Sequence, residues 1–161
     1  MITPEKYIER LCEASNKKLI ILQSLYQLTQ RQSDMINQDK LDSLEEIISQ
    51  KQKHIDQIDK LDEEFNVYFL RLKQQLNIGS MDELEKTQMK GIKELKQTIC
   101  QVMETIKEIS GLEQQNNSKA KELLDELGTE IRKVNQGKKV TSAYNPGNAL
   151  RPPSYYIDKK E

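Results

Sequence analysis

The chain contains no tryptophan and little aromatic material of any kind. Of its 161 residues, 5% are aromatic and 35% are hydrophobic, whereas 32% are charged. This composition provides too little bulky apolar surface for a thick globular core, and it favours long helices that each bury a narrow stripe. We therefore expect one all-α domain, an elongated antiparallel three-helix coiled-coil bundle with a long third helix.

Residues that build catalytic or metal sites are also scarce. The chain has one histidine, His54, and two cysteines, Cys12 and Cys100. A single histidine cannot supply the ligands of an ordinary zinc site, and the sequence has no glycine-rich phosphate loop or nucleophile elbow. These absences predict a protein that is not an enzyme and that uses no metal or cofactor. Both cysteines replace an apolar residue on a helical stripe, so we expect buried free thiols.

No charge of one sign dominates. The formal net charge is −1, with acids and bases interspersed, so no strong field favours nucleic acid or an anionic membrane as a partner. No apolar run approaches the ~20 residues that cross a bilayer, and no signal peptide is visible. We expect a cytoplasmic protein without direct membrane insertion.

Helical periodicity fills most of the chain. Apolar side chains recur by threes and fours, the spacing that keeps one face of a helix against its neighbours. We expect a bundle over residues 1–136, with helices at about 4–36, 39–77 and 81–136.

Local signals support these boundaries. Thr3 and Pro4 suit the start of the first helix, and Gly79 suits the left-handed end of the second. Ser80 and Glu83 form a capping-box pattern for the third helix. Within that helix, Gly91 is a candidate kink.

The lengths of the predicted helices do not match. If short connections make neighbours antiparallel, the third helix overhangs the other two by ~15 Å at its C-terminal end. The overhang still carries an apolar stripe, which is a candidate docking surface for another helix. Its residues are Leu123, Leu124, Leu127, Ile131 and Val134.

Two charged residues interrupt the apolar stripes at the same level of the predicted bundle. Lys51 of the second helix lies level with Glu113 of the third. The pair can form a charged layer that fixes register, or both side chains can lie at the rim and reach water along their stems. The sequence alone leaves both arrangements open.

The last residues, 137–161, differ from everything before them. They contain three tyrosines and three prolines, which cannot continue a helix but suit an extended segment with aromatic anchors for a partner. We expect a flexible tail.

Three segments together resemble the FlgN-type flagellar export chaperones. Residues 39–65, with an acidic start, a leucine pair and central Lys51, are similar to the second helix of that family. Asn116 and Asn117 before a leucine-rich helix end resemble its substrate-binding region, and the tail with Tyr144 resembles its tyrosine- and glycine-rich ending.

The resemblance implies a non-enzymatic cytoplasmic chaperone. Such a protein binds the C-terminal helices of the hook-filament junction proteins FlgK and FlgL and delivers them to the type III export gate protein FlhA. Client binding would lie on the stripe from Leu123 to Val134, and gate binding would map to Tyr144. The sequence departs from the family at Asn145 and Pro146, where a glycine usually follows the tyrosine.

A second interpretation remains open. The same stripe could pair with its own copy, which would make the protein a self-associating structural coiled coil, a homo-oligomer. Solution mass separates the two interpretations, because a chaperone awaiting its client can be monomeric.

Overall fold

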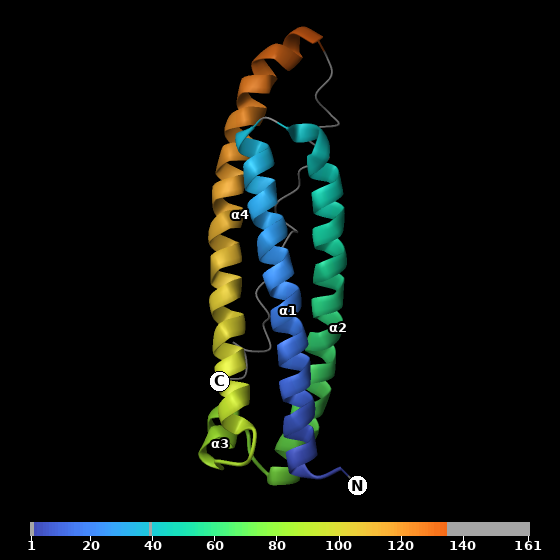
Figure 1. Ribbon diagram of the computed structural model, residues 1–161, viewed down its shortest axis with the longest axis vertical. Helices are drawn as coiled ribbons and strands as arrows, with labels where there is room; N and C mark the ends of the chain where they lie inside the picture. Colours follow the sequence, from blue (N-terminus) through green and yellow to red (C-terminus); the bar gives the residue numbers. More distant parts are fainter. Residues whose placement is uncertain (1, 39, 135–161) are drawn as a thin grey trace. The chain divides into compact units, whose positions relative to one another are not determined.

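The computed structural model describes residues 2–38 and 40–134, and every regular element among them is helical. The elements are α1 (Pro4–Asn37), the short 3-10 helix η1 (Leu41–Ser43), α2 (Leu44–Leu76), α3 (Met81–Lys86) and α4 (Ile92–Val134) (Figure 1). The predicted all-α fold is confirmed. The predicted tail, with Tyr144, lies outside the described residues.

Side-chain oxygens mark two helix starts that the sequence predicts. Thr3 Oγ1 accepts a hydrogen bond from the backbone N–H of Lys6 at 3.2 Å, and α1 begins at Pro4. Ser80 Oγ accepts from the backbone N–H of Glu83 at 3.3 Å and caps α3. The Glu83 carboxylate accepts in turn from the N–H of Gly79. The first two bonds each satisfy an amide in the first turn of a helix, which has no partner within the helix, and the third ties α3 to the residue before its cap.

The predicted helix over 81–136 is divided in the structure. α3 ends at Lys86 and α4 begins at Ile92, so the prediction of a mere kink at Gly91 is wrong. Gln88 has φ 52° and Gly91 has φ 91°, and neither value is compatible with an α-helix. A Cβ at Gly91 would also lie 3.0 Å from Ile8 Cγ2, so a side chain there would require Ile8 to shift.

The end of α2 also differs from the prediction. Asn77, with φ 54°, takes the left-handed conformation, and Gly79 is not among the residues with positive φ. Asparagine is one of the few residues other than glycine that adopts this conformation readily. The left-handed residue that ends α2 is therefore Asn77, two positions before Gly79, the glycine that the sequence suggests for this role.

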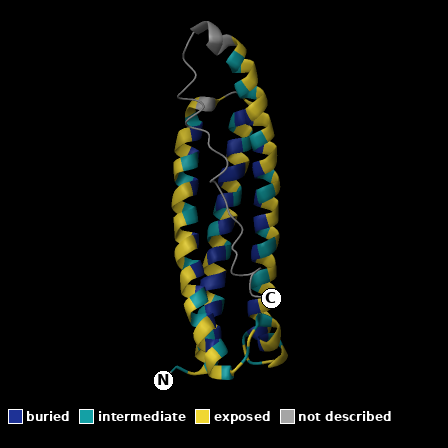
Figure 2. Cartoon of the chain, turned by 180° about the vertical axis from the view of Figure 1, so that it is seen from behind, coloured by how far each residue is buried: buried dark blue, intermediate teal, exposed yellow. Residues whose placement is uncertain are grey.

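The described chain forms two compact units, each built from segments of the long helices. Unit 1 contains residues 2–23 and 56–106, and unit 2 contains residues 24–55 and 107–134. In each unit the buried residues lie on helix faces that turn toward neighbouring helices (Figure 2).

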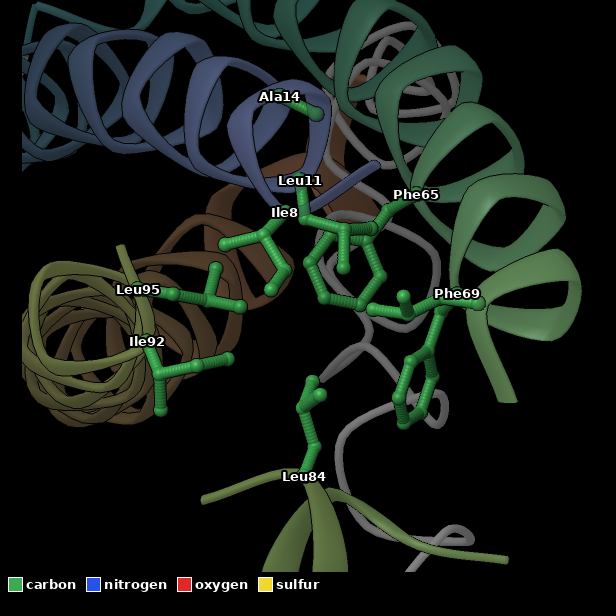
Figure 3. Close-up of a cluster of buried hydrophobic side chains, with 9 residues drawn as sticks. Ile8, Leu11, Ala14, Phe65, Phe69, Leu84, Ile92 and Leu95 are labelled. Atoms are coloured by element: carbon green, nitrogen blue, oxygen red, sulfur yellow. The ribbon is translucent and has the colours of Figure 1, made fainter. Parts of the chain in front are cut away.

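Unit 1 has an apolar core to which four helices contribute. Leu84 from α3 is fully buried and points toward side chains of α1, α2 and α4 (Figure 3). The labelled members of this cluster are Ile8, Leu11, Ala14, Phe65, Phe69, Leu84, Ile92 and Leu95. The short helix α3 therefore closes the core at the connection between α2 and α4.

Unit 2 contains a small apolar cluster near the end of α1 and the start of α2. Ile36, Leu44 and Ala120 are buried there, one from each long helix, and Met35, Ile48 and Leu123 pack against them. Elsewhere in this unit the interior holds both apolar residues, Leu25, Leu28, Ile47 and Ile109, and polar ones, Thr29, Gln32, Lys51, Glu113 and Asn116.

Candidate functional site

A buried charged layer joins α2 to α4 in unit 2. Lys51 Nζ donates to Glu113 Oε1 and, at 2.8 Å, to Gln32 Oε1 of α1. Lys51 is 3% exposed and Glu113 is 8% exposed. The interpretation in which both side chains reach water at the rim is therefore wrong, and the charged layer is confirmed.

Burial changes the protonation chemistry of this layer. It lowers the pKa of the Lys51 ammonium below its ordinary value of 10.5, and the opposite charge of Glu113 counteracts the shift. The carboxylate is therefore needed to keep a buried ammonium charged.

A second polar layer joins α4 to α1 about one turn further along. Asn116 Nδ2 donates to the backbone carbonyl of Thr29 at 3.3 Å, and Ser33 Oγ donates to Asn116 Oδ1 at 2.5 Å. Asn116 is 3% exposed and Thr29 is fully buried. Both sides of the Asn116 amide thus have partners, which makes this level of the bundle specific for one alignment of the two helices.

The sequence prediction missed two members of the buried polar set, Lys18 and Gln32. In unit 1, Lys18 is 1% exposed and its Nζ lies 2.6 Å from Asp62 Oδ1 of α2. The adjacent Leu19, an apolar residue that would suit a buried helix face, is only partly buried. The sequence contained a signal for both missed residues, because a set of buried residues in α1 is spaced by three and four positions in strict alternation. These residues are Ile8, Leu11, Ser15, Lys18, Leu22, Leu25, Thr29, Gln32 and Ile36.

The contacts in unit 2 show where α4 extends beyond the ends of α1 and α2. Lys51 lies level with Glu113, so Leu44, seven residues before Lys51 in the antiparallel helix, lies level with Ala120. The two do share an apolar cluster, together with Ile36 near the end of α1. Past Leu123, α4 continues for eleven residues to Val134, or about 16 Å.

The predicted stripe lies on this projecting segment. Leu123 packs against the small apolar cluster, while Leu124 and Leu127 are partly exposed on the following turns. Ile131 and Val134 belong to α4, but their side chains are outside the described set. Tyr144 lies outside the described residues.

The remaining candidate groups have ordinary structural explanations. Cys12 and Cys100 are free, and the prediction that both are buried is wrong for Cys100, which is exposed. Burial raises the pKa of the Cys12 thiol, with nearby carboxylates adding to the effect, so it is a poor nucleophile. His54 Nδ1 lies 2.8 Å from the carbonyl oxygen of Gln50 in its own helix.

The described residues include no cluster of histidine, cysteine and carboxylate side chains that could hold a metal ion. None of the described helices has a stretch both long and apolar enough to span a membrane.

Comparison with known proteins gives one assignment. No curated protein and no solved structure matches the chain at a significant level. A family scan, however, matches residues 1–152 to the family described as FlgN protein. That match covers nearly the whole chain, and it names the same family that the sequence resembles. The chain belongs to the FlgN family of flagellar export chaperones.

Proposed function

We propose that this protein is a cytoplasmic, non-enzymatic chaperone for hook-filament junction proteins of the FlgK and FlgL type. Its client is the C-terminal helical segment of such a protein, which lies along the projecting end of α4. The protein then delivers the client to the export gate protein FlhA through Tyr144 in the tail. Family membership supports the class of function, and the clients and the gate contact are the proposed refinements.

One observation carries the docking site. In unit 2, α4 extends past Leu44 of α2 and Asn37 of α1 while its apolar repeat continues. The stripe consists of Leu123, Leu124, Leu127, Ile131 and Val134. A client helix with its own apolar face would complete the missing packing.

The magnitude is sufficient for specific binding. Full burial of a leucine or isoleucine side chain contributes about 1.5–3 kcal/mol. Two such residues, Leu127 and Ile131, therefore account for roughly 3–6 kcal/mol, which corresponds to about a hundredfold or more in affinity.

The test replaces Leu127 and Ile131 together by Asp in the full chain. The probe is a purified C-terminal helical segment of a hook-filament junction protein, titrated by calorimetry. We expect affinity to fall at least about a hundredfold with little change in melting temperature, because both positions follow Leu123 on the segment of α4 that projects past Leu44 and Asn37. A large fall in melting temperature would show that the stripe is core.

A matched control introduces the same charges outside the stripe. Ser118 and Thr129 are exposed on α4, so Ser118→Asp with Thr129→Asp should leave client affinity within about threefold of wild type. If both double variants lose binding equally, charge alone is responsible and the stripe is not the site.

Self-association is the competing use of the same stripe. Light scattering of the free protein should give the mass of a monomer. A dimer that dissociates in the Leu127→Asp, Ile131→Asp variant would instead support the structural coiled coil.

A further inference from the structure

The register of α4 is not determined by its apolar residues alone. The stripes of α2 and α4 repeat every seven residues, so a slide by one repeat again places apolar positions level with apolar positions. The connection between α2 and α4 spans residues 77–91 and includes α3, whose Leu84 packs in the core of unit 1, so it restrains the start of α4. The apolar repeat of unit 2 does not distinguish these alignments, so another feature must favour one of them there.

The buried polar groups of unit 2 make that selection. If α4 slides one repeat in one direction, Lys51 becomes level with Ile106 and Glu113 with Leu44. If it slides in the other direction, Lys51 becomes level with Ala120. None of these apolar side chains can accept from an ammonium or donate to a carboxylate, so each slide leaves buried charges unpaired.

Asn116 also restricts the alignment of α4, in this case relative to α1. Its amide bonds Ser33 and the Thr29 carbonyl in the observed alignment, and a slide of seven residues would separate them by about 10 Å. The two layers thus tie α4 to both of its neighbours in unit 2.

We propose that Lys51, Glu113 and Asn116 form a register lock that sets how far α4 projects beyond α1 and α2. A slide in one direction would bring Leu44 level with Leu127 and cover the stripe. A slide in the other direction would bring Leu44 level with Glu113 and expose Ala120. The consequence for client docking rests on the proposed function, whereas the lock itself does not.

The lock can be tested by distance measurement in the full chain. With Cys12→Ala and Cys100→Ser as background, spin labels are placed at Glu46→Cys of α2 and Lys107→Cys of α4, both exposed positions in unit 2. Pulsed electron–electron double resonance should give one distance population between the two labels when Lys51, Glu113 and Asn116 are unchanged. Adding Lys51→Met, Glu113→Met and Asn116→Leu, which removes all three members of the lock, should produce a second population about 10 Å away, in at least about a tenth of the molecules.

Two controls separate pairing from general repacking. The swapped pair Lys51→Glu, Glu113→Lys should keep a single population, because the charges still match. Ile55→Leu with Ile109→Leu alters the adjacent apolar layer while leaving the lock intact, and it should also keep a single population. If circular dichroism shows that the Met variant is unfolded, Lys51→Leu with Glu113→Ala and Asn116→Leu replaces it, with the same expectation.

A single, unshifted distance in a folded apolar variant overturns the lock, whatever happens to binding. A second population in the swapped pair overturns it as well. Titration with the purified junction-protein segment tests the functional consequence separately. If the populations split but affinity is unchanged, the lock stands and its link to client docking fails.

Discussion

Replacing Asp62 by Leu should destabilise the protein far more than replacing Asp62 and Lys18 together. Lys18 Nζ lies 2.6 Å from Asp62 Oδ1, and the two side chains are 1% and 7% exposed. Without Asp62, the Lys18 ammonium loses its nearest opposite charge while remaining buried, and breaking such a pair costs about 3–5 kcal/mol.

The chemistry of lysine sets an upper limit on that cost. The side chain can escape the penalty by losing its proton, which at pH 7 costs about 5 kcal/mol from an ordinary pKa of 10.5. Burial already lowers the pKa of Lys18, and the charges of Asp62 and Asp59 oppose that shift. Because Asp59 remains in the variant, we expect the loss to lie near 3 kcal/mol.

Urea unfolding followed by circular dichroism measures this loss. For a chain of 161 residues, about 3 kcal/mol corresponds to a fall in melting temperature of roughly 6–12 °C. The paired variant Lys18→Met, Asp62→Leu should lie within about 1 kcal/mol of wild type, because an apolar pair replaces both charges. A loss below about 1 kcal/mol for Asp62→Leu, or an equal loss in the paired variant, would refute the reasoning.

Three further predictions concern pH, local stability and the tail. The folded pKa of Lys18 is lowered, so the unfolded chain binds more protons between that value and 10.5. The unfolding free energy relative to Lys18→Met, Asp62→Leu should therefore rise with pH in that window, and a flat or falling difference in urea titrations would contradict this. Backbone hydrogen exchange should be faster in α4 over residues 107–123 than over 92–106, because polar groups are buried in unit 2 where unit 1 has its larger apolar cluster. These polar groups are Gln32, Lys51, Glu113 and Asn116. Equal protection of the two segments would contradict this prediction. Tyr144→Ala should leave client affinity unchanged and weaken docking of the client complex to the cytoplasmic domain of FlhA, and calorimetry giving identical gate affinities would remove that role from Tyr144.

Local chemistry made much of the fold predictable. Thr3 and Ser80 start helices because their hydroxyls satisfy nearby backbone amides, an effect that depends on only a few neighbouring residues. The alternation of three and four along the chain likewise predicts helices with one buried face. The same repeat contained Lys18 and Gln32, and the prediction lost them only because lysine and glutamine are seldom buried.

Contacts between distant residues decided the rest. Whether Lys51 lies at the rim or in the interior depends on which residue of α4 stands level with it, and no local property of the second helix contains that information. The break before Ile92 is similar, since residues 81–90 have ordinary helix propensity, yet Leu84 reaches the core of unit 1 only if the chain turns at Gln88 and Gly91. The sequence by itself determined the helices and the apolar repeat of the stripe. Only tertiary packing decided which charges are buried and where α4 extends beyond α1 and α2. Both depend on the alignment between helices rather than on the residues within one helix.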